Sequence, residues 1–150
     1  MASIATVGET DLSDLLPLMR GYCDFYEVSP SDDALLAMSR ALIEDPRREG
    51  LQLIARNDAG EAVGFATVFW TWSTSSAARI GVMNDLFVAA EARGHGTADE
   101  LIAACARLVR DRGGRSLDWQ TAKDNLRAQA VYDRVGGKRD ERWLSYSIEL

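Results

Sequence analysis

The chain has few of the residues on which small disulfide-bonded or metal-binding proteins depend. Its 150 residues include two cysteines, three prolines and one histidine. Cys23 and Cys105 are isolated and fall on apolar helical stripes, so we interpret them as small core residues in a reducing compartment. A single histidine, His95, excludes a His-rich metal cluster and argues against triad chemistry. We therefore expect no metal site.

Long apolar runs and targeting segments are also missing. No run approaches the roughly 18 apolar residues that a membrane span requires. Residues 1–7 lack the basic start and the long apolar core of a signal peptide. We therefore expect a cytoplasmic protein with no membrane partner. The formal net charge of −6 disfavours nucleic acid as a partner and favours cationic substrates.

Length and composition are those of one ordinary domain. A chain of 150 residues buries about two-thirds of its unfolded surface. The apolar content of 47% and the charged content of 27% are typical of globular proteins. There is no internal repeat, low-complexity tract or linker, so we expect a single domain over residues 1–150.

Hydrophobic periodicity predicts a mixed order of strands and helices. Strands are predicted at residues 3–7, 51–57, 62–72, 79–88, 115–121 and 143–148. Helices are predicted over residues 10–26, from about 29 to before 46, from 97 to a left-handed cap at 113–114, and from about 124. A tight hairpin is predicted at residues 57–60. This order indicates an α/β fold in which helices cover both faces of a mixed sheet.

The most informative stretch joins the strand that ends at Val88 to the helix that begins at Thr97. The turn between them is rich in glycine and carries Arg93. Helix N-termini leave backbone N–H groups unpaired and carry partial positive charge, and glycines allow close approach of the backbone, so the turn predicts a pyrophosphate site. In the alternative interpretation, Thr97 and Glu100 form a capping box at an ordinary turn. The position of His95 in the turn indicates a spacer near phosphate, with a solvent-exposed residue as the simpler interpretation.

A second candidate segment lies on the helix that begins near Asp124. Asn125, Ala128 and Tyr132 are spaced i, i+3 and i+7, which places them on one helical face. The small alanine between an amide and a phenol leaves a groove for a ligand. In the alternative interpretation, Tyr132 is a half-buried tyrosine that packs the helix onto the sheet.

These two segments resemble the conserved blocks of the GNAT (Gcn5-related N-acetyltransferase) superfamily. Arg93, Gly96 and Ala98 match its acetyl-CoA signature, Arg/Gln-x-x-Gly-x-Gly/Ala. The segment from Asn125 to Gly136 matches its block Asn-x-x-Ala-x-x-x-Tyr-x-x-x-Gly. The order and separation of the blocks and the predicted element order are those of the family. The resemblance covers essentially the entire chain and implies one acyl-CoA N-acyltransferase domain, with a six- to seven-stranded mixed sheet, about four helices and a homodimeric assembly.

The resemblance implies acetyl-CoA as cosubstrate. The family binds pantetheine to strand backbone exposed by a bulge, lines the pantetheine arm with the Asn and small residue of the second block, and uses the tyrosine as the acid that protonates the departing thiolate. The implied cofactor-binding residues are Leu86, Phe87, Val88, Arg93, Gly94, His95, Gly96, Thr97, Ala98, Asp99, Asn125, Ala128 and Tyr132. Leu86-Phe87-Val88 occupy the place of the bulge.

The chain departs from the family at the position of the general base. In the spermidine/spermine acetyltransferases the segment Glu-Asp-Phe-Phe-Val resembles residues 84–88, and Asn84 stands at the glutamate position. Strand alternation places Asp85 on the face opposite Asn84. We consider two hypotheses, a water relay or Asp85 acting at the bulge. A backbone N–H near Val88 is the expected oxyanion donor.

The acceptor is expected to be a small primary amine, cationic or polyamine-like. Tyr26-Glu27 resembles the Tyr-Glu pair that contacts polyamine in that branch, and Trp119 offers an apolar or cation–π wall. Ordinary packing is the alternative interpretation of these residues. Two other functions remain open. One is acetylation of protein lysine side chains or N-termini, and the other is a non-catalytic acyl-CoA sensor, which Asn84 favours and Tyr132 opposes.

Overall fold

The computed structural model describes residues 1–150, which form two compact units, Met1–Gln120 and Thr121–Leu150. The first unit contains β1 (Ser3–Thr6), α1 (Leu12–Phe25), α2 (Asp32–Glu44), β2 (Gly50–Arg56), β3 (Ala62–Ser73), β4 (Ala78–Val88), α3 (Thr97–Asp111) and β5 (Leu117–Asp118), with 3₁₀ turns η1 (Glu9–Asp11) and η2 (Ala90–Ala92). The second unit contains α4 (Leu126–Arg134). A single domain over both units stays a prediction.

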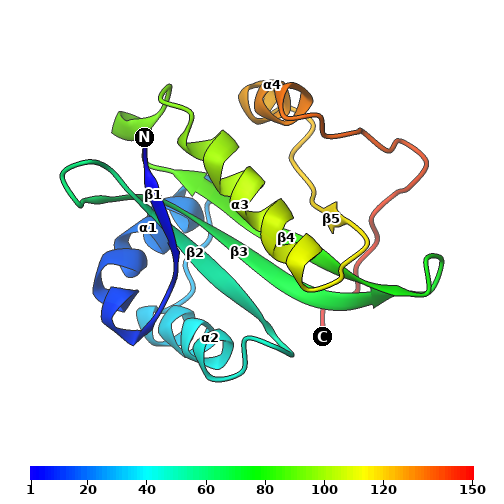
Figure 1. The fold of residues 1–150 in the computed structure, drawn as a ribbon, viewed down its shortest axis with the longest axis horizontal. Helices are drawn as coiled ribbons and strands as arrows, with labels where there is room; N and C mark the ends of the chain where they lie inside the picture. Colours follow the sequence, from blue (N-terminus) through cyan, green and yellow to red (C-terminus); the bar gives the residue numbers. More distant parts are fainter. The chain divides into compact units, whose positions relative to one another are not determined.

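The first unit is built on a five-stranded mixed sheet in the order β1-β2-β3-β4-β5 (Figure 1). Neighbours from β1 to β4 are antiparallel, and β5 is parallel to β4. The mixed α/β class is confirmed, but the predicted count of six or seven strands is wrong. Residues 143–148 form no strand, and β5 has two residues in place of the seven predicted at 115–121. A strand needs a ladder partner along its length, and β5 pairs with β4 only at Gly81 and Val82.

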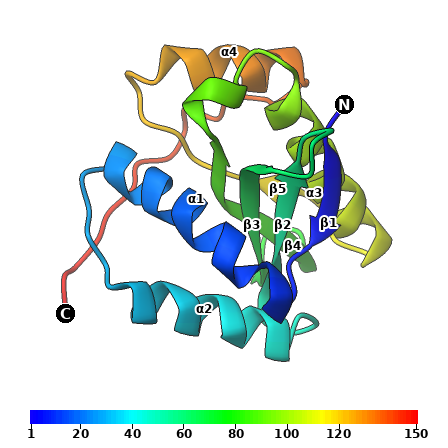
Figure 2. The same ribbon diagram turned by 90° about the vertical axis from the view of Figure 1, so that its left-hand side faces the viewer.

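Helices cover both faces of this sheet, as predicted. Figure 2 shows α1 and α2 on one face and α3 on the other. The core on the α1 side contains Val7, Leu12, Leu15, Leu18, Met19, Cys23, Leu35, Ile54 and Phe65. On the other side, a Cβ at Gly81 would lie 2.4 Å from Val109, so glycine lets α3 approach β4 closely. Both cysteines are free and buried, and burial raises the pKa of the Cys105 thiol to about 12, as expected of a core residue.

Local turn and cap chemistry sets the ends of these elements. Ser31 caps α2 by accepting a 3.1 Å hydrogen bond from the Ala34 N–H. In the predicted hairpin, the Gly60 N–H donates to the Asn57 carbonyl at 2.9 Å. At the end of α3, Gly113 has a φ of +76°, and the Gly114 N–H bonds to the Val109 carbonyl at 2.9 Å. None of the helices has the length and apolarity needed to cross a bilayer.

Candidate active site

A β-bulge in β4 organises the candidate site. Thr67 of β3 pairs with Asp85, and the next residue of β3, Val68, pairs with Met83, so Asn84 is an extra residue in β4. Leu86, Phe87 and Val88 pair regularly with β3. The register shift against β3 therefore lies at Asn84, two residues before the predicted segment, and the exposure of backbone at residues 86–88 to a ligand stays a prediction. A bulge leaves its extra residue outside the ladder and bends the strand, which re-aims the side chains beside it.

The bulge also corrects the predicted orientation of Asn84 and Asp85. Strict alternation would place the two side chains on opposite faces of β4. Instead the Asn84 amide donates a 3.1 Å hydrogen bond to the Asp85 carboxylate. Asn84 is exposed and Asp85 is only 8% exposed. Because the extra residue breaks the period of two, both side chains reach the same site.

The Asp85 carboxyl group lies on the face of the sheet that α1 covers. Burial raises its pKa above the ordinary value, and hydrogen bonds from Thr67, Tyr22 and Asn84 oppose that rise. The Tyr22 hydroxyl also lies 3.4 Å from the Asn84 carbonyl oxygen. Burial and the neighbouring Asp85 raise the pKa of Tyr22, so its phenol stays protonated and acts as a donor. A carboxyl group with a raised pKa is suited to general-base catalysis near neutral pH.

The open edge of β4 presents backbone groups at Val88. The Ala89 N–H bonds to the Val63 carbonyl of β3 at 2.8 Å. Successive residues of a strand direct their N–H and C=O groups to opposite edges, so the groups of Val88 point away from β3. The Val88 carbonyl accepts a 2.9 Å hydrogen bond from Arg93 Nε. No strand pairs with this end of β4 on that side, because β5 reaches only Val82.

The turn after β4 leads into α3 through two left-handed glycines. Gly94 and Gly96 have φ values of +85° and +80°. Gly96 is the N-cap of α3 and has no side chain with which to cap this end. The alternative of a Thr97–Glu100 capping box is wrong, because Thr97 is already helical and the Glu100 carboxylate accepts from the Ala2 N–H at 3.1 Å. A long helix whose N-terminus lacks a side-chain cap, beside an arginine, has the chemistry of an anion site.

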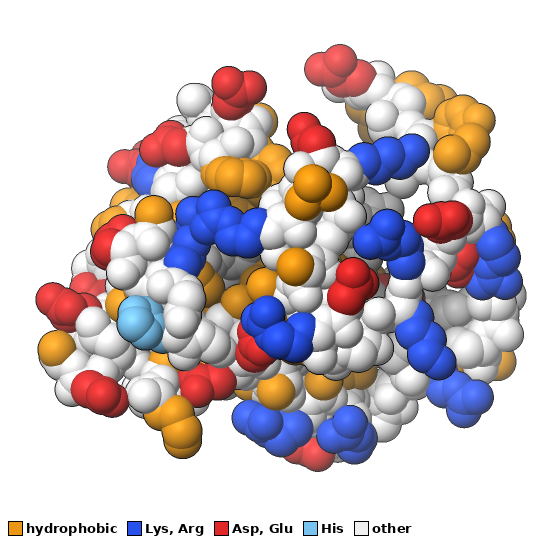
Figure 3. Space-filling model, turned by 90° about the horizontal axis from the view of Figure 1, so that it is seen from above, with side chains coloured by type: hydrophobic (Ala, Val, Ile, Leu, Met, Phe, Trp, Pro, Cys, Tyr) orange, Lys and Arg blue, Asp and Glu red, His pale blue; other side chains and the backbone are white.

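The remaining residues of this turn differ in exposure. Thr97 is buried in the first turn of α3, with Ala98 and Asp99 half-buried beside it. His95 is exposed, and the single histidine appears in pale blue on the surface in Figure 3. Arg93 also lies over the Phe87 ring, 5.9 Å from its centroid. The turn therefore places one permanent cation next to the open end of β4.

In the second unit, Asn125 was predicted to lie within the helix, and the structure places it just before the helix. It is the N-cap of α4, and its side-chain oxygen accepts a 3.2 Å hydrogen bond from the Ala128 N–H. Asn125, Ala128 and Tyr132 are all half-buried. The i, i+4 spacing of Ala128 and Tyr132 keeps these two side chains on one face of α4.

Aromatic side chains gather at the C-terminal end of α1. Tyr22 and Tyr26 have ring centroids 4.9 Å apart, and Phe25 and Tyr26 have theirs 5.1 Å apart. Phe25 is 54% exposed and Tyr26 is 43% exposed, so neither ring is ordinary core. Glu27 follows with a φ of +55°. Trp119 is half-buried and follows β5 in the chain.

Glu27 completes a Schellman motif at the end of α1. The Glu27 N–H bonds to the Asp24 carbonyl at 3.1 Å, and the Val28 N–H bonds to the Cys23 carbonyl at 3.0 Å. Glycine is the usual residue at this position, because a side chain is strained there. Glu27 therefore occupies a strained position beside exposed aromatic rings, which is a pattern found at functional sites.

Sequence reasoning missed two buried polar side chains that line up with Asp85 across the sheet, Thr67 and Gln52. The Gln52 amide lies 3.2 Å from Thr67 Oγ1, and both residues are buried. A signal was present, because Gln52 and Thr67 are polar residues within otherwise apolar strands. Such a residue in a buried strand needs a hydrogen-bond partner, and that requirement points to a network.

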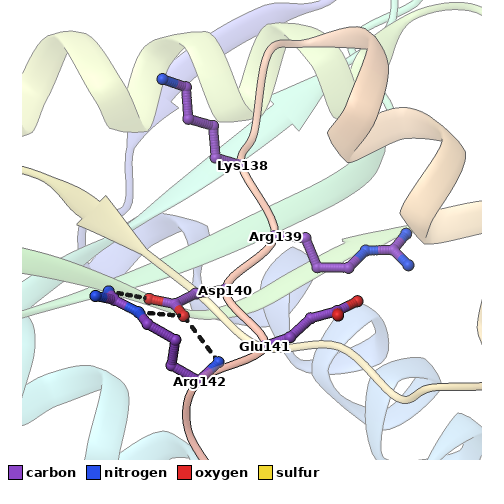
Figure 4. A pocket seen from close by; sticks show the side chains of 5 residues that line it. All are labelled: Lys138, Arg139, Asp140, Glu141 and Arg142. Carbon is purple, nitrogen blue, oxygen red and sulfur yellow. Dashed lines mark hydrogen bonds and ion pairs between the residues drawn. The ribbon is translucent and has the colours of Figure 1, made fainter.

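A separate hollow runs along Lys138–Arg142 in the second unit (Figure 4). Five consecutive residues of one exposed segment form it, and Arg142 folds back to pair with Asp140 at 2.6 Å. These hydrogen bonds hold the pKa of Asp140 well below its usual range. Arg139 lies 3.9 Å from Asp133 of α4, so only Arg142 and Asp140 pair within the segment itself.

Comparisons with known proteins identify the family of this chain. Residues 15–137 match the sequence profile of the Acetyltransferase (GNAT) family. The chain is 30% identical over 141 residues to the uncharacterized N-acetyltransferase YhfO of Bacillus subtilis, covering 94% of this chain and 93% of that protein.

Solved structures share the fold. The aminoglycoside N-acetyltransferase AAC(6′)-Iy, crystallised with CoA, is 25% identical with a TM-score of 0.84, and the match covers 100% of this chain and 96% of that one. A ribosomal-protein-alanine N-acetyltransferase from Brucella melitensis biovar Abortus is 24% identical with a TM-score of 0.78, covering 100% of both chains, and supports the fold alone. The chain belongs to the GNAT family and is an acetyl-CoA-dependent N-acetyltransferase.

Proposed function

We propose that this enzyme acetylates a small primary amine that carries positive charge, with Asp85 as the general base and Tyr132 as the general acid. The observation that carries the proposal is the buried Asp85 carboxylate at the β4 bulge, linked by Tyr22 to the aromatic end of α1. AAC(6′)-Iy, which shares the fold, has been crystallised with the bisubstrate analogue CoA-S-monomethyl-acetylneamine.

Several features of the α1 terminus favour a cationic acceptor. The C-terminal end of a helix carries partial negative charge, and the last turn of α1 holds no basic residue. Asp24 and Glu27 are exposed there and add carboxylates. The faces of Tyr26 and Phe25 are suited to cation–π contact with an ammonium group. Together these groups define the acceptor site of the proposal.

The donor site of the proposal is the region from Leu86 to Asp99. Strand-like contacts at the open edge of β4 bind the pantetheine arm, and the uncapped start of α3 with Arg93 binds the pyrophosphate. Asn125, Ala128 and Tyr132 extend this site by family resemblance. The Val88 N–H, which points away from β3, is the proposed donor to the carbonyl oxygen of the thioester.

The chemistry proceeds by direct transfer. Asp85, directly or through one water, takes a proton from the ammonium group of the acceptor. The free amine attacks the thioester carbonyl, and the N–H of Val88 stabilises the developing oxyanion. The C–S bond then breaks, the departing thiolate takes a proton from Tyr132, and the Tyr132 phenolate takes back the second proton of the attacking nitrogen. Trp119 is proposed as an apolar wall for the acceptor.

The test is CoA release from acetyl-CoA with polyamines, monoamines, amino acids, aminoglycosides and lysine peptides as acceptors. Amine-dependent turnover that prefers small cations supports the proposal. Replacing Tyr132 by Phe should lower kcat by about 100-fold or more. Preference for peptides would move the acceptor assignment to protein lysine or N-terminal groups. Turnover unchanged in both Asp85→Asn and Tyr132→Phe would overturn the assigned roles.

A further inference from the structure

Three polar side chains form a row across the centre of the sheet. Gln52 of β2 pairs with Thr67 of β3, and Thr67 pairs with Asp85 of β4. Directly paired residues project from the same face. The three residues are 2%, 0% and 8% exposed. Polar groups buried to this degree are costly unless each finds a partner, so the row is a hydrogen-bonded unit.

The direction of the hydrogen bonds follows from the chemistry of the groups. Gln52 Nε2 lies 3.2 Å from Thr67 Oγ1 and 3.7 Å from Met19 Sδ. A thioether sulfur only accepts, so the amide nitrogen and not the oxygen faces Met19. The amide therefore donates to Thr67, which leaves the single O–H of Thr67 to donate to the Asp85 carboxylate.

The environment of the Gln52 amide oxygen supports this orientation. Gln52 Oε1 is buried and has no protein hydrogen-bond partner. Gln52 also lines a cavity of about 60 Å³ between β2 and α2, together with Ser39 and other residues. That volume is enough for water, which donates to a carbonyl oxygen. The amide nitrogen thus donates to Thr67, and the amide oxygen is left to accept from a water.

We propose that Gln52 is a positioning residue for Asp85, acting through Thr67, whose hydroxyl hydrogen it turns toward the carboxylate. The inference rests on the proposed role of Asp85 as the base. The other titratable groups that face Asp85 come from α1: Tyr22 in contact with it, and Cys23 and Tyr26 beside Tyr22. None of these is a cation, so the hydroxyl donors oppose the cost of burying the charge.

The first test is the pH profile of kcat/KM with the best acceptor. Thr67→Val removes the donor to Asp85, and the acid limb should move up by about one pH unit. Gln52→Met removes the donor to Thr67 and frees the hydroxyl to rotate, so the limb should move up by about half a unit. The double variant should shift no more than Thr67→Val alone, because both act through one O–H group. Thr67→Ser should restore the wild-type profile.

Ser39→Ala is the matched control. Ser39 is buried and donates to Met19 Sδ at 3.6 Å, as Gln52 does, but it is not a partner of Thr67. The control should leave the acid limb in place even where stability falls. A loss of activity that is uniform over pH in Gln52→Met, with an unmoved limb, would show a structural role only and overturn the proposal.

A direct titration of Asp85 separates this inference from the proposed function. The ¹³C carboxyl shift of Asp85, assigned with Asp85→Asn, is followed by NMR in wild type, Gln52→Met and Thr67→Val without acceptor. An upward shift of the Asp85 titration in both variants supports positioning even if Asp85 is not the base. An unchanged titration, in an enzyme whose turnover depends on Asp85, rejects positioning and leaves the proposed function intact.

Discussion

Asp85 shows how the environment of one side chain defines a candidate catalytic group. The carboxyl group lies at a bulge, buried to 8% exposure, and accepts hydrogen bonds from donors on α1, β3 and β4. None of these donors is a lysine, arginine or histidine. Its raised pKa comes from burial, and a buried ionised carboxylate costs stability that a neutral group does not cost.

Asp85→Asn is therefore expected to lower activity and change the pH dependence of stability. Because Asp85 is the proposed base, its replacement should reduce kcat/KM by about 100-fold or more. Because the folded-state pKa is raised, the native state holds its proton more tightly, and wild-type stability falls as pH rises through that folded pKa. The variant lacks this loss, so its stability relative to wild type should increase from pH 4 to pH 7.

Urea unfolding at the two pH values measures that difference. Asp58→Asn, in the exposed hairpin turn, is the control and should show no such trend. A relative stability of Asp85→Asn that stayed constant between pH 4 and pH 7 would contradict the raised folded-state pKa.

At the scale of elements, strand and helix ends supply the binding groups. β4 ends at an open edge, α3 begins without a side-chain cap, and α1 ends in a strained Schellman motif at Glu27. Regular elements pair their own backbone groups, so their ends are where backbone polarity remains available to ligands. The donor site and the acceptor site of the proposal both lie at such ends.

Glu27→Gly tests whether this strain is kept for function. Glycine adopts the left-handed conformation without a Cβ penalty, so the free energy of unfolding should rise by about 0.5–1 kcal/mol. If Glu27 contacts the acceptor, KM for a cationic amine should rise in the same variant. Glu27→Gln, which keeps the strain but removes the charge, should raise KM at unchanged stability. Unaltered KM in both variants would leave Glu27 a structural residue.

At the scale of the whole molecule, the end of the second unit carries a cluster of strongly exposed apolar side chains. Trp143, Leu144, Tyr146 and Ile148 are each at least 74% exposed and belong to no strand. Exposed apolar groups of this density mark interaction surfaces more often than chance placement does. A homodimer, a cytoplasmic location and the lack of nucleic-acid and membrane partners stay predictions.

Sedimentation velocity tests the dimer. A homodimer sediments as a species of twice the 16.5 kDa chain mass, and its population should fall on dilution. Trp143→Asp together with Ile148→Asp should shift the protein toward monomer, because buried charge opposes association. Arg127→Asp, at an exposed position, lowers the net charge by the same two units and is the control for surface charge. A protein that sediments as a monomer at every concentration would contradict the predicted homodimer.

Local patterns in the sequence were sufficient for the helices, the hairpin at residues 57–60 and the cap at Gly113, because periodicity and turn chemistry act within a few residues. The glycine turn with Arg93 was visible for the same reason. The bulge at Asn84, the row from Gln52 to Asp85 and the lack of a strand at residues 143–148 were not. Register is set by pairing between segments distant in the chain, and a one-residue slip changes which side chains share a face.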